Sequence, residues 1–256
     1  MADILAIGAH PDDVEIAVGG TLLKMRDRGY SVVLCHASDG EPTPRGNRET
    51  RLAEARAAAR FLGAEVEVLS LRNRYIMDAL QARRELALVI RKHRPTLILS
   101  PWPVGEHPDH RAVARLADAS RFYAKLTKTD DRGEPWELPP WWAPDQLYYH
   151  LASAVEDPRP AFVVDITEEY PRKQELLACY RSQGNVDMER LAKNAFWGEL
   201  IGVRYGEPFF RRGGLPLPDL SGFLGPPGEG PSMVRPRRAE RPEALRRRTR
   251  RSRNGG

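Results

Sequence analysis

The chain has 256 residues, of which 41% are hydrophobic and 29% charged, and its formal net charge is +5. This length suits one large α/β domain or two small domains. No apolar run approaches the ~20 residues that a membrane span needs, and the apolar run at 4–7 is too short for the core of a signal peptide. Two cysteines make no disulfide framework. We therefore expect a soluble, cytoplasmic protein and exclude disulfide-stapled, membrane-spanning and collagen-like classes.

The positive charge is concentrated at the C-terminal end. Residues 231–256 contain ten arginines and two glutamates, a net charge of +8, which leaves −3 for the first 230 residues. The segment 225–231 is rich in proline and glycine, which predicts a hinge before an arginine-rich, disordered tail. We therefore divide the chain into a domain over 1–224 and a hinge with tail over 225–256. The tail is expected to be a solvated extension, and the alternative is an arm that binds nucleic acid.

Short apolar runs alternate with amphipathic segments along the first half of the chain. Strands are predicted at 4–9, 31–37, 65–71 and 96–100, and helices at 14–28, 49–62, 78–93 and 111–124. Gly29 and Gly63 end the first two helices, and Asp78 is placed to cap the third. Four such alternations are typical of a parallel sheet with helices on its faces. The predicted fold class is therefore α/β, with a mainly parallel sheet flanked by helices.

The pattern loosens after residue 128. Strands are predicted at 146–151 and 161–166 and helices at 167–181 and 186–203, with Thr167 as the N-cap of the first of these helices. The segment 134–142 is expected to be a loop, because it is rich in proline and tryptophan. We assign these elements to the same domain.

Two loops concentrate the residues that carry chemistry. Ala9-His10-Pro11-Asp12-Asp13 follows the first predicted strand, and Glu106-His107-Pro108-Asp109-His110 follows the fourth. Ligands of parallel sheets collect beyond the carboxyl ends of the strands, so we expect the two loops to meet there. His-Pro and Pro-Asp pairs also occur in ordinary turns. Two such loops on one sheet edge nevertheless favour a metal site of the zinc class, since imidazole and carboxylate suit that ion.

Each group in the two loops has a candidate role in hydrolysing an amide. His10, Asp13 and His110 supply three metal ligands and leave a position open, which is typical of a catalytic site. Asp12 is then free to take a proton as general base. His107, oriented by Asp109, is expected to stabilise the developing oxyanion or to donate a proton to the leaving amine. Zinc is the expected metal, and iron, cobalt and manganese remain alternatives.

These motifs resemble the LmbE-like, or PIG-L, family of metal-dependent N-acetylglucosamine deacetylases. The matching segments are Gly8–Glu15, Gly19–Thr21 and His107–His110. The resemblance runs from about residue 3 to residue 224 and implies a Rossmann-like, three-layer fold. It also implies zinc on His10, Asp13 and His110, with Asp12 as general base and His107 supported by Asp109. Relatives in the family suggest a trimer or a hexamer.

Within that family the chain looks closest to the bacillithiol branch, which deacetylates N-acetylglucosaminyl-malate. The stretches that carry this resemblance are Asp3–Ala6, Gln146–Tyr149, Tyr180–Gln183 and Gly202–Phe210. The resemblance implies that Arg51, Gln183 and Tyr205 face the substrate. Other N-acyl sugars remain alternatives: a mycothiol precursor, a chitooligosaccharide or a glycopeptide.

Three of these positions leave an alternative or a departure open. Arg51 could bind a carboxylate such as that of malate, or could be a surface arginine that pairs with Glu49 or Glu54. Tyr205 could donate to the oxyanion or could be a packed aromatic residue. Asn73 stands where many members of the family have an aspartate, and this departure is expected to alter recognition of sugar hydroxyls.

Overall fold

Five parallel strands form the central sheet of the structure, a computed structural model that describes residues 1–128, 135–151, 159–184 and 188–215. The strands are β1 (Ile4–Gly8), β2 (Val32–His36), β3 (Glu65–Val68), β4 (Leu97–Pro101) and β5 (Asp145–Tyr149). Their order across the sheet is β3-β2-β1-β4-β5, and every neighbouring pair is parallel. The expected α/β class with a mainly parallel sheet is confirmed.

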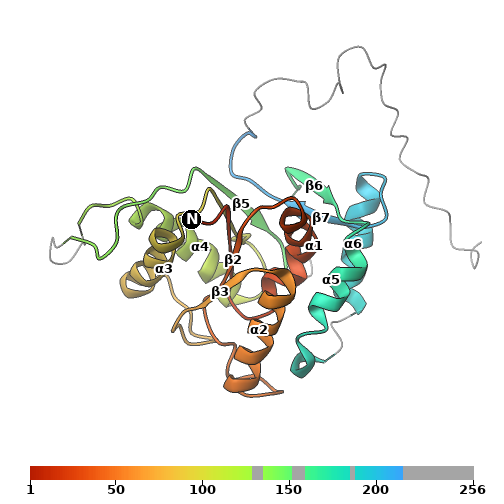
Figure 1. The fold of residues 1–256 in the computed structure, drawn as a ribbon, viewed down its shortest axis with the longest axis horizontal. Coiled ribbons are helices and arrows are strands. Elements are labelled where there is room, and N and C mark those ends of the chain that lie inside the picture. Colours follow the sequence, from red (N-terminus) through yellow and green to blue (C-terminus); the bar gives the residue numbers. More distant parts are fainter. Residues whose placement is uncertain (129–134, 152–158, 185–187, 216–256) are drawn as a thin grey trace, which may run out of the picture.

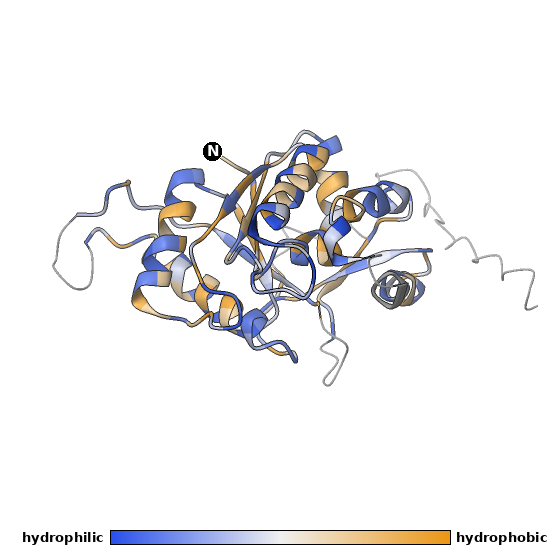
Figure 2. Cartoon of the chain, turned by 90° about the horizontal axis from the view of Figure 1, so that it is seen from below, coloured by the Kyte–Doolittle hydropathy of each residue, from blue (hydrophilic) through white to orange (hydrophobic). Residues whose placement is uncertain are grey.

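Helices cover both faces of this sheet and make three layers (Figure 1). On one face lie α1 (Asp13–Asp27) and α2 (Arg48–Leu62), and on the other lie α3 (Leu80–His93) and α4 (Pro108–Tyr123). Alternate strand residues supply the two cores, so Ala6 and Leu34 pack against α1 and α2 while Ile7 and Cys35 pack against α3 and α4. Because both faces are covered, every residue of β1 and β2 is buried, and all of them except His36 at the end of β2 are apolar or glycine. The helices have an apolar and a polar side (Figure 2).

A second, smaller sheet lies beside α1. It pairs β6 (Phe162–Asp165) with β7 (Gly206–Phe209) in antiparallel register. The same region holds α5 (Tyr170–Leu177), the short 3₁₀ helix η1 (Arg181–Gln183) and α6 (Met188–Leu200). The sequence analysis missed β7, because its four residues include a glycine and a proline, which are rare inside strands. A bridge between Tyr148 and Phe210 joins the end of β7 to the edge strand β5.

Two predicted helix caps are wrong. Asp78 does not cap α3, which begins at Leu80 after Ala79, and its carboxylate instead accepts two hydrogen bonds from the Arg83 guanidinium at 2.6 and 2.8 Å. Thr167 does not cap α5, which begins three residues later, and its hydroxyl accepts the backbone N–H of Tyr205 at 3.3 Å. In both places the polar side chain hydrogen-bonds to another residue and does not bond to the backbone N–H groups of the helix that it was predicted to cap.

A buried ion pair attaches the small sheet to the middle of α1. The Glu207 carboxylate accepts the backbone N–H groups of Gly20 at 2.9 Å and Thr21 at 2.7 Å. The Lys173 ammonium donates to Glu207 and to the Ile16 carbonyl, each at 2.7 Å, and both charged side chains are fully buried. Gly20 is needed here because a Cβ at that position would come within 2.8 Å of the Ile166 side chain of the chain segment after β6. The sequence analysis did not identify this pair.

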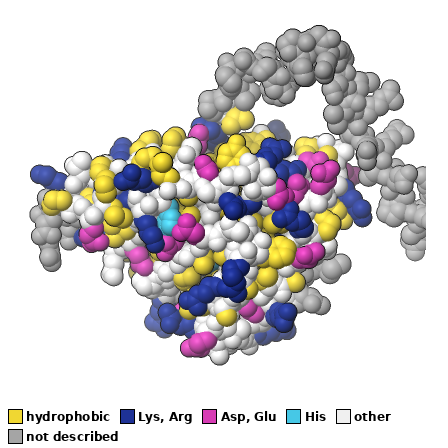
Figure 3. Space-filling view, in the orientation of Figure 1, with side chains coloured by type: hydrophobic (Ala, Val, Ile, Leu, Met, Phe, Trp, Pro, Cys, Tyr) yellow, Lys and Arg dark blue, Asp and Glu magenta, His cyan; other side chains and the backbone are white. Residues whose placement is uncertain are grey.

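Some expectations concern residues outside the described part of the chain. The hinge and tail at 225–256 lie there, as do residues 185–187 before α6 and part of the predicted loop at 134–142. Within the described ranges, no helix has both the length and the apolar content to cross a bilayer. Acidic and basic side chains are interspersed over the face of the molecule drawn in Figure 3.

Candidate metal centre and active site

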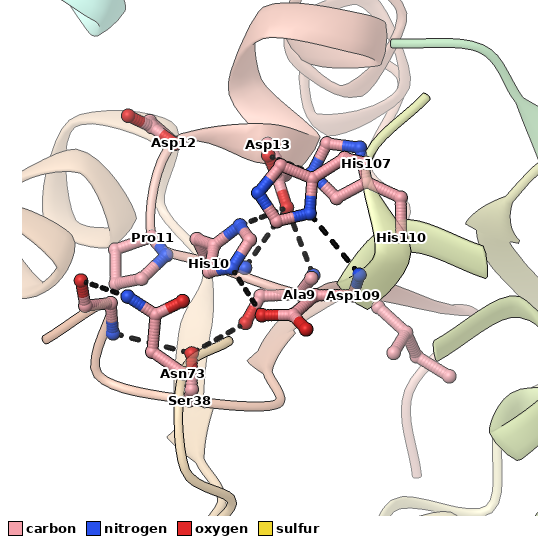
Figure 4. A network of polar contacts seen from close by, with 12 residues as sticks. Ala9, His10, Pro11, Asp12, Asp13, Ser38, Asn73, His107, Asp109 and His110 are labelled. Atoms are coloured by element: carbon pink, nitrogen blue, oxygen red, sulfur yellow. Dashed lines mark hydrogen bonds and ion pairs between the residues drawn. The ribbon is translucent and has the colours of Figure 1, made fainter. Parts of the chain in front are cut away.

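The two motif-bearing loops meet at the carboxyl edge of the sheet, as predicted. One leads from β1 into α1 and the other from β4 into α4, and β1 and β4 are neighbours in the sheet. His10, Asp13, His107 and His110 converge from these loops (Figure 4). The rings of His10 and His110 lie 5.4 Å apart, centroid to centroid, and those of His107 and His110 are stacked at 4.5 Å.

His10, Asp13 and His110 have the spacing of a metal-binding trio. Each offers one ligand atom, and these atoms all lie within 4.8 Å of one another. His10 Nδ1 is 3.4 Å from Asp13 Oδ2, and His110 Nε2 is 3.2 Å from Asp13 Oδ1. Ligands held about 2.1 Å from a tetrahedral zinc ion are about 3.4 Å apart. The donor set and its spacing therefore fit a zinc-class ion.

Backbone hydrogen bonds hold the carboxylate of Asp13 in place. Its Oδ2 accepts the backbone N–H groups of Ala9 at 3.0 Å and His10 at 2.9 Å. Burial raises the pKa of Asp13, but His110 and His10 more than offset this and hold the pKa well below its ordinary value. Asp13 is therefore ionised, as a metal ligand must be.

Asp109 orients His10, whereas the sequence analysis assigned it to His107. Asp109 Oδ2 lies 3.2 Å from His10 Nε2 and also accepts the backbone N–H of Arg74 at 2.6 Å. The hydrogen bond between Asp109 and His107 comes from the Asp109 backbone, whose N–H is accepted by His107 Nδ1 at 3.2 Å as the N-cap of α4, while the Asp109 carboxylate lies near the His107 ring. A carboxylate on the far nitrogen of a histidine ligand fixes the ring and its tautomer. The spacing of two residues misled the prediction because a distant loop brings a better partner.

His107 lies exposed at the mouth of the site. Burial, His110 and His10 lower its pKa, and Asp109 opposes them only in part. A lowered pKa disfavours the protonated ring that the expected donation of a proton to the leaving amine requires. The neutral ring can still donate or accept a hydrogen bond to a group that reaches the opening.

Asp12 lies in sequence between the candidate metal ligands His10 and Asp13 and has an unusual backbone conformation. Its φ of 104° lies in the left-handed region, which non-glycine residues rarely adopt. Burial, together with the neighbouring Asp13, raises the pKa of Asp12 to about 7, although Arg51 acts in the opposite direction. A carboxylate with a pKa near neutrality suits a general base.

Arg51 is directed at the first loop and is not a surface residue. Its side chain is only 3% exposed, Nη1 lies 3.6 Å from Asp12 Oδ2, and Nη2 donates to the Pro11 carbonyl at 2.6 Å. Gly40 makes room for it, since a Cβ there would lie 3.1 Å from the guanidinium. The structure therefore gives Arg51 a contact with the candidate base, and the alternative of a surface arginine paired with Glu49 or Glu54 does not describe it.

A cavity of about 410 Å³ opens over this constellation. One wall is formed by residues 38–47, which connect β2 to α2 and which we call the cavity loop. The residues lining the cavity are His10, Asp12, Asp13, Ile16, Gly40, Pro42, Thr43, Pro44, Arg51, Asn73, Arg74, His107, His110 and Gln183. Of the residues that the resemblance assigned to substrate, Arg51 and Gln183 therefore lie at the cavity.

Tyr205 does not reach this cavity. Its ring stacks on that of Tyr170, with centroids 3.5 Å apart and an interplanar angle of 7°. Its backbone carbonyl accepts the N–H of Ile166, which ties it to the region beside the C-terminal half of α1, away from Asp12. The expected role as oxyanion donor is thus not supported by the geometry, and the packed-aromatic alternative describes this residue.

Some residues at or near the cavity make contacts that the sequence did not predict. Asn73 is buried, and its side-chain nitrogen donates to the carbonyls of Gly40 and Pro42, so it contacts the cavity loop. Arg74 lines the cavity with φ of 69°. Glu15, the last residue of the first motif, accepts a 2.5 Å hydrogen bond from Tyr180. The motif had already marked Glu15, but nothing local to it indicates Tyr180, 165 residues away.

Comparisons with known proteins give the family of this chain and the names of its relatives. A family model described as PIG-L, GlcNAc-PI de-N-acetylase, matches residues 5–120. Diacetylchitobiose deacetylase of Thermococcus kodakarensis is 28% identical over 221 residues, which are 80% of either chain. 4-oxalmesaconate hydratase of Pseudomonas putida is 25% identical over 70% of this chain and 73% of its own.

A solved structure supports the same relationship. The conserved protein TT1542 from Thermus thermophilus superposes with a TM-score of 0.76 at 30% identity, covering 85% of this chain and 97% of its own. This likeness extends well beyond the residues that the family model matches. The chain therefore belongs to the PIG-L family and is an enzyme of its metal-dependent N-deacetylase class.

Proposed function

We propose that this enzyme removes acetate from an N-acetylglucosamine conjugate, with N-acetylglucosaminyl-malate as the favoured substrate. The observation that carries the proposal is the trio of His10, Asp13 and His110 beside Asp12, whose pKa is raised to about 7, at one cavity. Arg51 and Arg74 line the same cavity and favour an anionic conjugate such as a malate glycoside.

In the proposed reaction, His10, Asp13 and His110 hold a zinc ion, which when bound polarises the amide carbonyl and makes water more acidic. Asp12 takes the proton of the attacking water, and Arg51 holds Asp12 and its loop in place. Asp109 keeps the His10 ring oriented. His107, at the mouth, hydrogen-bonds the oxyanion. As the C–N bond breaks, the proton taken from water passes from Asp12 to the leaving nitrogen, directly or through His107, and acetate and the free amine are released. Gln183 is proposed to contact the sugar from the opposite wall.

The first experiment measures acetate release by the purified protein from three conjugates. These are N-acetylglucosaminyl-malate, N-acetylglucosaminyl-inositol and N,N′-diacetylchitobiose, with free amine measured in parallel. A higher kcat/KM for the neutral disaccharide than for the malate conjugate would contradict the favoured branch. Because one relative is named as a hydratase, an unsaturated dicarboxylate is included, and water addition without acetate release from any sugar would overturn the proposed deacetylation.

Substitution of the base provides the mechanistic test. Asp12→Ala is expected to lower kcat by about 10²–10⁴, while Asp78→Ala, which removes a carboxylate bound to Arg83 outside the cavity, should leave kcat unchanged. Near-normal turnover by the Asp12→Ala protein would eliminate Asp12 as the base. His10→Ala should also lower the zinc content of the purified protein, and a chelator should inactivate the wild type until zinc is restored.

A nucleic-acid arm is the second candidate, since the tail carries a net charge of +8. Deleting residues 226–256 should leave acetate release unchanged if the tail is an accessory. A full chain that binds nucleic acid in a salt-dependent way but hydrolyses no conjugate would favour this candidate instead.

A further inference from the structure

The cavity loop is held by side chains from two other segments of the chain. At one end, Asn73 Nδ2 donates to the carbonyls of Gly40 at 2.7 Å and Pro42 at 3.2 Å. At the other end, Gln183 Nε2 donates to the Arg45 carbonyl at 3.3 Å. The residues between these contacts, 42–44, line the cavity. The shape of that wall therefore depends on both contacts.

The contact at Arg45 depends in turn on Ser182. Gln183 Nε2 donates to Ser182 Oγ at 2.9 Å as well as to the Arg45 carbonyl, so the hydroxyl helps to fix the direction of the amide. Gly46, at φ 88°, packs so closely on Ser182 that a Cβ there would lie 3.1 Å from the Ser182 Cβ. Ser182 thus contacts both the cavity loop and the side chain that holds it.

Glu54, on α2, holds Ser182 through both carboxylate oxygens. Oε1 accepts the Ser182 backbone N–H and Oε2 accepts its hydroxyl, each at 2.6 Å. Glu54 is only 8% exposed, so its charge is committed to these two donors. It lies one helical turn after Arg51, whose guanidinium faces Asp12. Neighbouring turns of α2 therefore contact the candidate base, through Arg51, and the segment that holds the cavity loop, through Glu54.

We propose that Glu54 is a positioning residue for the substrate cavity, which acts through Ser182 to hold Gln183 and the cavity loop in the shape that binds the sugar conjugate. The expected change in KM rests on the proposed function. The expected change in the order of the cavity loop rests only on the contacts described above. Without the carboxylate, the Ser182 N–H and hydroxyl lose their acceptor, so the hydroxyl that directs the Gln183 amide is no longer held in place. Binding should weaken while Asp12 and the metal ligands stay in place.

The chain contains a matched control for this interaction. Glu85 on α3 accepts the backbone N–H of Ser70 at 2.7 Å and its hydroxyl at 3.0 Å, in the same two-point arrangement, but outside the active-site cavity. Glu54→Ala and Glu85→Ala therefore remove the same chemistry from two helices. Only the first is expected to alter substrate binding.

The experiment compares these two variants by kinetics and by hydrogen exchange. With the better of N-acetylglucosaminyl-malate and N,N′-diacetylchitobiose as substrate, Glu54→Ala should raise KM by about tenfold, the effect of losing one well-placed hydrogen bond, and leave kcat within about twofold. Glu85→Ala should change neither. Glu54→Gln, which can accept from the N–H and donate to the hydroxyl, should restore most of the wild-type KM. Amides of residues 38–47 should exchange faster in Glu54→Ala and not in Glu85→Ala.

Either of two results would overturn the proposal. One is unchanged exchange of the cavity loop in Glu54→Ala, and the other is an unchanged KM with a loss of thermal stability equal to that of Glu85→Ala. If Glu54→Ala does not fold, Ser182→Ala replaces it, because this variant removes the hydroxyl that joins Glu54 to Gln183. KM and the hydrogen exchange of the cavity loop then decide the proposal in the same way. If the wild type hydrolyses neither substrate, the proposed function fails, and hydrogen exchange alone still decides the positioning role.

Discussion

Asn73→Asp tests how firmly the cavity loop is held, because it preserves the size of the side chain and removes both of its donors. The native amide donates to the carbonyls of Gly40 and Pro42 at 2.7 and 3.2 Å. The two lost bonds cost about 2 kcal/mol at about 1 kcal/mol each, and a buried carboxylate that faces carbonyl oxygens adds roughly 1–3 kcal/mol. We expect the free energy of unfolding to fall by about 3 kcal/mol or more, and KM to rise by about tenfold.

Urea denaturation at pH 8 measures this loss, with Asn73→Ala as the control that removes the bonds without adding charge. The alanine variant should lose only about 2 kcal/mol. The introduced carboxyl should have a raised pKa in the folded state, since only its protonated form can donate to a carbonyl. The group therefore disfavours folding least at low pH, and the gap between the two variants should narrow as the pH falls towards about 4. An Asn73→Asp protein as stable as wild type at pH 8, or one more stable than Asn73→Ala, would refute this reasoning.

Three further predictions follow from contacts outside the metal ligands. Asp109→Asn should lower zinc affinity by about 10–100-fold, measured by competition with a chelator. The asparagine side-chain oxygen can still accept the Arg74 N–H, so the variant should fold, and an unfolded variant would contradict the role of Asp109 in orienting His10. Lys173→Met leaves the fully buried Glu207 without its cation and should cost about 3–5 kcal/mol in urea denaturation; a loss below about 1 kcal/mol would show that the pair is dispensable. Tyr205→Phe should retain kcat, because the ring stacks on Tyr170, and a tenfold fall in kcat would restore a catalytic role for its hydroxyl.

The parts of the fold that sequence predicted are those in which local pattern and burial agree. Helices cover β1, β2 and β4 on both faces, so these strands appear in the sequence as apolar runs. The two His-Pro-Asp motifs follow β1 and β4, which are neighbours in the sheet. Parallel neighbours place their carboxyl ends together, and that rule was enough to bring His10 and His110 to one site.

The failures share a physical cause, which is competition from partners distant in sequence. Asp109 is two residues from His107, yet its carboxylate lies against His10, 99 residues away, and accepts an N–H from Arg74. Tyr205 lies in a stretch that resembles a substrate-binding family segment, but Tyr170 provides a flat partner for its ring. A short motif specifies residue type and spacing, and tertiary packing decides the direction of each side chain.

The left-handed backbone conformation of Asp12 matters for any attempt to raise the thermal stability of this enzyme. A non-glycine residue at φ 104° stores roughly 1–3 kcal/mol of conformational energy, which Asp12→Gly would release while deleting the proposed proton acceptor. Screening a variant library for heat resistance alone would enrich that substitution and yield robust, inert protein. Thermal stability and catalytic activity therefore place opposite demands on residue 12. A selection for more stable variants of this enzyme has to include an activity assay in every round.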